Sequence, residues 1–130
     1  MIVVDASALL TVLLRTAHAG DLTRRILDPE ETLHAPHLLD LEVAQVTRRY
    51  YLSGDLDRRR GAEVLRDLAD LRLTRYSHTI MLPRIWELRE NVTAYDAAYI
   101  ALAEALEAPL VTRDAKLAQA PGHYAIVELL

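Results

Sequence analysis

Four acidic residues in this chain occupy positions from which their side chains could act together. Asp5 directly follows a β-branched run at the start of the chain, which predicts a buried strand. Asp114 follows a second short apolar run, at 110–112. Glu42 and Asp96 lie in the first turns of two predicted helices. Because sites in open α/β sheets form beyond the carboxyl ends of strands, Asp5 and Asp114 would meet there if their strands are neighbours.

Each of these acids also has a purely structural explanation. Asp5 and Asp114 are suited to cap the helices that follow them, because a carboxylate accepts hydrogen bonds from free backbone N–H groups at a helix start. Thr93 and Asp96 fit a capping box, in which the acid returns a hydrogen bond to the cap. Glu42 is suited to a solvated helix face. Considered one at a time, the four residues need no functional explanation.

Considered together, the four acids favour a metal site over simple capping. Two carboxylates 4 Å apart repel by about 4 kcal/mol at an effective dielectric constant near 20, whereas a helix cap contributes only about 1 kcal/mol. A set of carboxylate oxygens suits Mg²⁺ or Mn²⁺ rather than zinc or copper. Mg²⁺ typically binds through one or two carboxylates plus a phosphate. We therefore expect a divalent ion and phosphoryl chemistry at these residues.

The composition limits the class of protein. The 130 residues, of which 52% are hydrophobic and 26% charged, predict a single globular domain over 1–130. The absence of cysteine excludes a disulfide framework, a thiol nucleophile and a cysteine-ligated metal. The net charge of −4 disfavours a nucleic-acid partner, but two divalent ions would neutralise it. The longest apolar run is too short to span a bilayer, so we expect a cytoplasmic protein without membrane contact.

Short apolar segments alternate with helical patterns along the chain. Strands are expected at 2–4, 33–35, 73–76, 110–112 and 125–127. Helices are expected at 6–14, from an Asp21 cap to about 28, at 38–52, and from Asp55 to about 71. The segment 79–90 is expected to be partly helical, with Pro83 near a helix start or a kink. Two further helices are expected, from a Thr93 cap to about 106 and from Asp114 onward. This alternation predicts a three-layer α/β/α sandwich around a parallel sheet, with right-handed crossovers.

Two of these helices carry patterns that predict their packing. In the helix at 38–52, the residues at steps of three and four that predict a core-facing stripe are Leu39, Val43, Val46 and Tyr50. In the helix after Thr93, one large-residue stripe consists of Tyr95, Tyr99, Leu102 and Leu106. A second stripe, of small residues that permit close packing, consists of Ala94, Ala98, Ala101 and Ala105.

Four sequence motifs follow one another along this chain. They are Val3-Val4-Asp5-Ala6-Ser7-Ala8, the Glu42 helix after Pro36, Asn91-Val92-Thr93-Ala94-Tyr95-Asp96-Ala97-Ala98-Tyr99, and Val111-Thr112-Arg113-Asp114. Together they resemble the pattern of PIN domains, and more narrowly that of VapC-type toxins, the ribonucleases of bacterial toxin–antitoxin pairs. The resemblance extends from the first strand to Pro121 and so covers nearly the whole chain.

The resemblance implies a particular fold and site. It implies a five-stranded parallel sheet in the PIN-like order 3-2-1-4-5, in which the first and fourth strands are neighbours. The residues that it implies for an acidic, catalytic and metal-binding pocket are Asp5, Glu42, Asp96 and Asp114. The hydroxyl groups of Ser7 and Thr112 resemble supports of that pocket. Some relatives carry a further acid where this chain has Lys116, which leaves open whether one or two metal ions bind.

The resemblance also implies a reaction and partners. Mg²⁺ or Mn²⁺ in the acidic pocket would activate water for attack on an RNA phosphodiester, leaving a 5′-phosphate and a 3′-hydroxyl. A 2′,3′-cyclic phosphate product would exclude this route, because it requires attack by the ribose 2′-hydroxyl. The expected partners are an RNA substrate, a second copy of the chain in a homodimer, and a small antitoxin. No residue pattern identifies the RNA sequence or the residues that contact it.

Two other function classes remain open from the sequence. A phosphotransfer protein of the haloacid-dehalogenase or receiver type also has an Asp after its first strand, but the dehalogenase pattern has a second Asp where this chain has Ser7. A phosphoryl donor would label Asp5 covalently in such a protein. The third class is a non-catalytic PIN-like binding module, against which the presence of all four acids argues.

Other polar residues have weaker claims to a function. His34 and His37 have a spacing that could ligate a metal, but solvated loop positions are the commoner explanation. The run Arg58–Arg60 could contact RNA, although charge runs on helices are more often solvated faces. The remaining arginines that the sequence offers as RNA contacts are Arg15, Arg84, Arg89 and Arg113.

Overall fold

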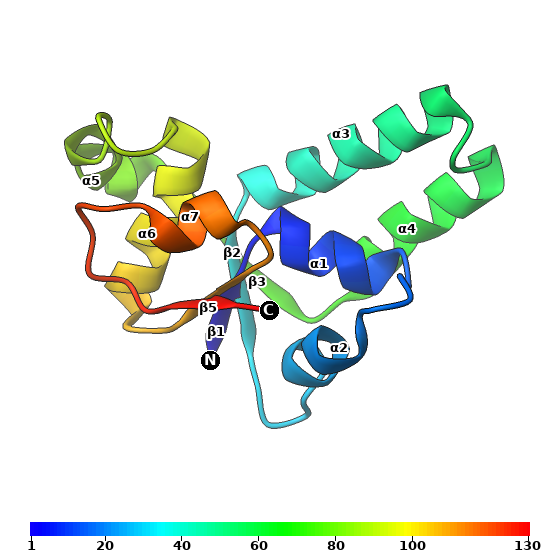
Figure 1. The fold of residues 1–130 in the computed structure, drawn as a ribbon, viewed down its shortest axis with the longest axis horizontal. Coiled ribbons are helices and arrows are strands. Elements are labelled where there is room, and N and C mark those ends of the chain that lie inside the picture. Colours follow the sequence, from blue (N-terminus) through cyan, green and yellow to red (C-terminus); the bar gives the residue numbers. More distant parts are fainter.

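A computed structural model describes the whole chain, residues 1–130, and its centre is one five-stranded sheet (Figure 1). The strands are β1 (Ile2–Val4), β2 (Leu33–Pro36), β3 (Leu73–Tyr76), β4 (Leu110–Thr112) and β5 (Val127–Leu129). All neighbouring pairs are parallel, in the order β3-β2-β1-β4-β5, which confirms the predicted order. β1 and β4 therefore pair directly, and their carboxyl ends lie side by side.

Helices cover both faces of the sheet. They are α1 (Ala6–Leu13), α2 (Gly20–Ile26), α3 (Leu38–Ser53), α4 (Arg58–Asp70), the short 3₁₀ helix η1 (Thr79–Met81), α5 (Leu82–Glu87), α6 (Ala94–Leu106) and α7 (Ala115–Gln119). Figure 1 shows α1 to α4 on one side of the sheet and α5 to α7 on the other. Right-handed crossovers explain this division, because the chain moves along the sheet in one direction as far as β3 and then returns through β4 to β5. The predicted three-layer sandwich is confirmed.

The core lies on both faces of the central strands, against α1 to α4 on one side and against α6 on the other. Every residue of β1 and β4 is buried, and α6 contacts β1, β2 and β4. In the predicted small-residue stripe of α6, Ala98 and Ala101 are buried, and the two end residues are exposed. In the large-residue stripe, Tyr99 is buried but Tyr95 is 67% exposed, so the stripe begins later than predicted.

Helices α3 and α4 form an arm that extends past the edge of the sheet (Figure 1). The predicted core stripe of α3 is correct for Leu39 and Val43, which are fully buried, but wrong at Tyr50, which is 39% exposed. The reason is length: a 16-residue helix spans about 24 Å, whereas a four-residue strand spans only about 13 Å. The second half of α3 therefore has no sheet to pack against.

Two predicted helix starts are wrong. Asp57, rather than Asp55, caps α4, because its carboxylate accepts a hydrogen bond from the Arg60 N–H at 2.7 Å. Asp55 instead accepts one from the Ser53 hydroxyl. Helix α2 begins after Ala19 without a side-chain cap, and Asp21 lies within its first turn. Two acids, Asp55 and Asp57, stand before α4, so residue type alone does not select its cap, and the single acid near the start of α2 is not its cap.

The last strand and the Pro83 segment complete the comparison. β5 begins two residues later than predicted, because the Leu110 N–H pairs with the Ile126 carbonyl and Val127 lies beside Leu110. The 79–90 segment is partly helical, as predicted, and Pro83 stands in the first turn of α5, where its missing N–H leaves no helix hydrogen bond unmade. No helix of the chain is both long enough and apolar enough to cross a bilayer.

Candidate active site

Asp5 lies at the carboxyl end of β1 and is held by three hydrogen bonds. Its carboxylate caps α1 by accepting from the Ala8 N–H at 2.9 Å. The Ser7 hydroxyl donates to the same oxygen, Oδ1, at 2.7 Å, and the Thr112 hydroxyl donates to Oδ2. The residue is only 5% exposed, so these donors replace the water that it loses. The capping explanation is correct, but two further hydroxyl donors exceed what a cap requires.

Ser7 and Thr112 join the ends of β1 and β4 around Asp5. Their hydroxyl oxygens lie 3.4 Å apart. The Arg113 N–H donates to Ser7 Oγ at 3.0 Å, and the Asp114 N–H donates to Thr112 Oγ1 at 2.9 Å. Each hydroxyl thus donates to Asp5 and accepts from the turn after β4. The two hydroxyl groups therefore fix the backbone of Asp114 relative to the Asp5 carboxylate.

Asp114 and Asp96 stand at the starts of two helices. Asp114 caps α7, where one of its oxygens accepts from the Lys116 N–H at 2.8 Å. Thr93 caps α6, where its hydroxyl oxygen accepts from the Asp96 N–H at 3.1 Å. Both acids are partly exposed. The predicted caps at Thr93 and Asp114 are confirmed, and both carboxylates remain accessible to solvent.

Glu42 reaches the site from α3, one turn after the helix begins. Its oxygen Oε1 accepts a hydrogen bond from the Tyr99 hydroxyl of α6 at 2.7 Å. Glu42 is partly buried, so it does not lie on the solvated helix face that its structural explanation assumed. The sequence assigned Tyr99 only to the core. Its spacing of three residues from Asp96 places both on one helix face but does not indicate a contact with Glu42.

Three of the four carboxyl groups, those of Asp5, Glu42 and Asp96, have raised pKa values. Burial is the main reason that the pKa values of Asp5, Glu42 and Asp96 lie above their usual range. The negative charge of Asp114 further raises the pKa of Asp5 and of Asp96. Asp5 and Asp96 together raise the pKa of Glu42, and the hydrogen bond from Tyr99 opposes this increase. The fold therefore brings the four predicted acids into one group of mutually repelling charges, hereafter the acidic site.

The donor atoms of the acidic site fit a hard divalent cation. All four side chains offer carboxylate oxygens, and Glu42 Oε2 and Asp114 Oδ2 receive no hydrogen bond from the protein. No three carboxylate or imidazole groups lie close enough to enclose an ion on their own. Mg²⁺ retains several water molecules when it binds protein, so carboxylates at this spacing suit a partly hydrated ion.

The weaker candidates have structural roles or lie apart from the acids. The ring nitrogens of His34 lie 2.8 Å from the Tyr76 hydroxyl and 2.9 Å from the Thr32 hydroxyl, so both are satisfied within the sheet. Arg84 forms a bidentate ion pair with Glu104. In the run Arg58–Arg60, the first two residues are exposed and the third donates to the carbonyl of Leu13.

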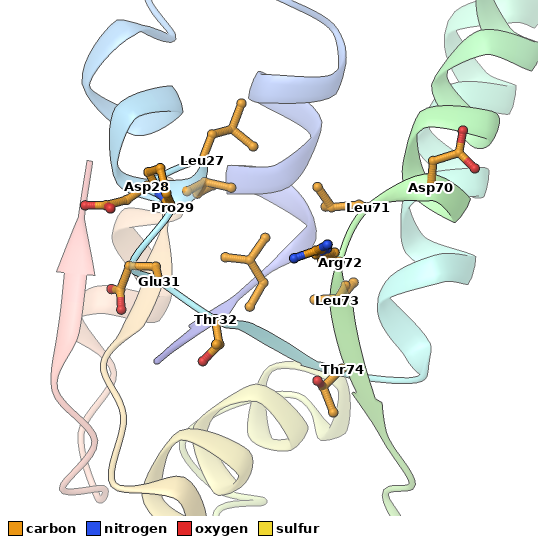
Figure 2. Close-up of a pocket in the computed structure, with 12 residues that line it drawn as sticks. Leu27, Asp28, Pro29, Glu31, Thr32, Asp70, Leu71, Arg72, Leu73 and Thr74 are labelled. Carbon is orange, nitrogen blue, oxygen red and sulfur yellow. The ribbon is translucent and has the colours of Figure 1, made fainter.

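One cavity lies apart from the acidic site. It has a volume of about 640 Å³ and lies between the segments that lead into β2 and β3. Figure 2 shows Glu31 and Thr32 on one side of it and Leu71 to Thr74 on the other. Because the strands are parallel, the starts of β2 and β3 lie at the opposite edge of the sheet from the carboxyl ends that carry Asp5 and Asp114.

Comparison with known proteins supports one family. The sequence model of the PIN domain matches residues 2–122, which include all four acids. The chain is 46% identical over 117 residues to VapC ribonuclease Mb0985 of Mycobacterium bovis, which covers 90% of this chain and 88% of that protein. It is 43% identical over 124 residues to ribonuclease VapC1 of Mycobacterium tuberculosis, which covers 92% of this chain and 90% of that protein.

Solved structures share the fold. PAE2754 from Pyrobaculum aerophilum aligns with a TM-score of 0.71 at 26% identity, over 97% of this chain and 82% of that chain. VapBC2 from Rickettsia felis, bound to a DNA fragment from their promoter, aligns with a TM-score of 0.70 at 16% identity, over 99% of this chain and 98% of that chain. The chain therefore belongs to the PIN-domain family and, within it, to the VapC group.

Proposed function

We propose that this chain is a metal-dependent endoribonuclease that acts as the toxin of a toxin–antitoxin pair. The main support for this proposal is that Asp5, Glu42, Asp96 and Asp114 lie close enough for their charges to repel one another. The chain also belongs to the PIN-domain family. The four residues are far apart in the sequence, and helix capping does not require them to meet. The relatives named VapC ribonuclease support RNA as the substrate.

The proposed cofactor is Mg²⁺ or Mn²⁺, the ions that carboxylate oxygen sets prefer. Asp5, Asp96 and Asp114 hold the ion, directly or through water, and Glu42 binds a second ion or orients the attacking water. A divalent ion supplies positive charge that stabilises the phosphodiester transition state and makes nearby water more acidic. Hydrolysis by water leaves a 5′-phosphate and a 3′-hydroxyl.

Ser7 and Thr112 are proposed to keep Asp5 oriented and ionised for this role. Burial raises the pKa of Asp5, and the hydrogen bonds from Thr112, the Ala8 N–H and Ser7 oppose that increase. The ionised carboxylate is the form that attracts a cation. Because the same hydroxyls accept from the turn after β4, they also keep Asp114 beside Asp5.

Replacement of Asp96 by Asn tests the proposed reaction. Asp96→Asn removes one negative charge but leaves the backbone N–H that Thr93 caps, so the fold is expected to persist. RNA cleavage should fall at least about a hundredfold, because the transition state loses charge stabilisation. Asp55→Asn, at the exposed start of the α3–α4 connection, is the matched control and should cleave like the wild type. Undiminished cleavage by Asp96→Asn would favour a non-catalytic role for the acidic site.

The proposed protein partners are an antitoxin and a second copy of the chain. The likeness to VapBC2 supports the antitoxin. Exposed apolar side chains gather on the α3–α4 arm and again from η1 to the start of α6, and such patches are typical of protein contacts. They are Tyr50, Tyr51, Leu52 and Leu65 on the arm, and Ile80, Leu82, Trp86 and Tyr95 on the second surface.

Light scattering should give twice the 14.7 kDa of one chain, and a monomer mass would contradict the homodimer.

Membership of the PIN-domain family removes the phosphotransfer alternative. Residues 1–130 form, in this proposal, one nuclease domain that works in the cytoplasm on cellular RNA. Asp5 then acts as a cation ligand and carries no covalent phosphate. Incubation with a phosphoryl donor should consequently leave the protein mass unchanged.

A further inference from the structure

Tyr99 makes a contact with the acidic site that core packing does not explain. The residue is 1% exposed, and its ring belongs to the main hydrophobic core. Its hydroxyl donates to Glu42 Oε1 at 2.7 Å across 57 residues of sequence. Burial and the neighbouring Glu42 charge raise the pKa of Tyr99, so the hydroxyl keeps its proton and acts as a donor. A phenylalanine would fill the same space without this hydrogen bond.

Glu42 differs from the other acids in how it is held. Asp5 and Asp114 each accept a backbone N–H at the start of their own helix. Asp96 lies in the first turn of α6, behind the Thr93 cap. Glu42 lies one turn inside α3, where every backbone N–H is already used by the helix, and the Tyr99 hydroxyl is the one protein donor to its carboxylate.

Without that donor, we expect the Glu42 side chain to rotate its carboxylate away from the other acids. A glutamate side chain has three rotatable bonds, and the negative charges of Asp5 and Asp96 both repel it. Solvent is accessible, because Glu42 is only partly buried. One charge-assisted hydrogen bond to a rigid, buried ring opposes both the repulsion and the loss of rotamer freedom.

We propose that Tyr99 is a positioning residue of the acidic site: its hydroxyl holds the Glu42 carboxylate against the repulsion of Asp5 and Asp96. Tyr99 thereby does for the Glu42 carboxylate what backbone N–H groups do for the carboxylates of Asp5 and Asp114. The inference rests on the proposed function for its effect on cleavage, but its effect on metal binding is independent of any RNA substrate.

Tyr99→Phe tests this role, and Tyr76→Phe is the matched control. Tyr76 also places its hydroxyl 2.8 Å from a polar partner, His34 Nδ1, but it lies on β3, which β2 separates from β1. Both variants keep the ring, so both should fold, as circular dichroism and thermal unfolding will show. Calorimetric titration with Mn²⁺ should show about tenfold weaker binding for Tyr99→Phe and an unchanged affinity for Tyr76→Phe.

A double-mutant cycle shows whether Tyr99 acts through Glu42. Tyr99→Phe should lower kcat for RNA cleavage about tenfold and leave KM within about twofold, because the substrate contacts persist. In a Glu42→Gln background, the same change should alter kcat less than about twofold. Equal tenfold losses in both backgrounds would overturn the inference, since Tyr99 would then act independently of Glu42. Wild-type kcat and Mn²⁺ affinity in Tyr99→Phe would also overturn it.

These readouts separate the inference from the proposed function. A wild-type protein that binds Mn²⁺ but cleaves no RNA would contradict the proposed function, and the Mn²⁺ titration of Tyr99→Phe would still decide the positioning role. A wild-type protein that cleaves RNA, with Tyr99→Phe indistinguishable from it, would contradict only the positioning role.

Discussion

At the scale of single residues, repulsion among the carboxylates of the acidic site destabilises the folded state of the metal-free protein. Burial raises the pKa of Asp96, the charge of Asp114 raises it further, the Thr93 hydrogen bond opposes the increase, and Asp5 adds to it. A raised pKa means that the folded protein disfavours the ionised form of the carboxyl group. In a cation-binding site, the positive charge of the bound ion offsets the repulsion between the carboxylates.

Removal of one charge should therefore stabilise the metal-free protein. Asp96→Asn eliminates repulsion of about 1 kcal/mol, the value for unit charges about 8 Å apart at an intermediate dielectric constant. The thermal midpoint without metal should rise by about 4 °C at neutral pH, whereas the control Asp55→Asn should leave it unchanged. Differential scanning calorimetry in EDTA measures both variants. A lower midpoint for Asp96→Asn would show that Asp96 stabilises the fold and is not held there against repulsion.

The same scale shows what the sequence can and cannot reveal about the site. The residue pattern predicted that Asp5 and Asp114 would meet if their strands were neighbours, and the resemblance to PIN domains supplied that strand order. The contact between Tyr99 and Glu42 was not predictable, because it depends on how α6 packs against the start of α3. A long-range contact between two helices leaves no spacing rule in the sequence.

At the scale of elements, caps and ion pairs fix the helices that carry the site. The α3–α4 arm depends on the cap of its second helix, and α5 depends on its ion pair with α6. Arg84 of α5 donates to both oxygens of Glu104, at 2.8 and 3.0 Å, and the Tyr124 N–H donates to Glu104 as well. This cluster joins α5, α6 and the C-terminal segment on the face of the sheet that carries Asp96.

The α4 cap predicts a clear contrast between two neighbouring acids. Asp57→Ala removes the acceptor for the Arg60 N–H and should lower the free energy of unfolding by about 1 kcal/mol. Asp55→Ala removes only an exposed bond to the Ser53 hydroxyl and should change it by less than about 0.5 kcal/mol. Urea unfolding of both variants measures the difference. The reverse order would restore Asp55 as the cap that the sequence predicted.

Glu104 predicts a pH dependence of stability. Burial alone would raise its pKa, but the Arg84 ion pair and the Tyr124 N–H hold the pKa below its ordinary value of 4.5. A carboxyl with a lowered pKa stabilises the fold above the unfolded pKa, and this contribution is lost as the pH falls through the folded pKa. Glu104→Gln should therefore destabilise the protein by about 3 kcal/mol at pH 7, because it breaks a buried ion pair.

The difference between wild type and Glu104→Gln should shrink below about pH 4.5, because the unfolded carboxyl takes up a proton there while the folded carboxyl is still charged. Urea unfolding at a series of pH values checks this. A difference that stays constant down to about pH 3 would show that the Glu104 charge contributes no stability.

Elements with strong periodicity were predictable, and their ends were less so. β1, β3 and β4 have the predicted bounds, because each contains β-branched or aromatic residues that favour strands. β5 was misplaced by two residues because Ala125, Ile126 and Val127 form one apolar run, and only pairing with β4 sets the register. The exposed half of α3 was missed because periodicity describes a helix face and not what lies opposite it.

At the scale of the whole molecule, the strand order creates the site. The order β3-β2-β1-β4-β5 places β1 beside β4 at the point where the chain reverses its direction along the sheet. Asp5 and Asp114 follow these two strands directly, and α3 and α6 approach from opposite faces with Glu42 and Asp96. The layers were predictable from the alternation of strands and helices, whereas the strand order came from the resemblance to PIN domains.

A fold built around repelling charges should be stabilised by the ion that it binds. Mn²⁺ at about 100 times its dissociation constant should add about 2.7 kcal/mol to the free energy of unfolding. The thermal midpoint of the wild type should therefore rise by several degrees, and Asp96→Asn should respond much less. Equal responses of the two proteins would place the bound Mn²⁺ elsewhere.

The most direct measurement of the central claim is cleavage of RNA by the purified protein, with the new ends mapped, in Mg²⁺ and in EDTA. The acidic site predicts cleavage in Mg²⁺ that leaves 5′-phosphate and 3′-hydroxyl ends, and none in EDTA. Cleavage that persists in EDTA, or that leaves a 2′,3′-cyclic phosphate, would contradict a reaction that depends on a divalent ion held by Asp5, Glu42, Asp96 and Asp114.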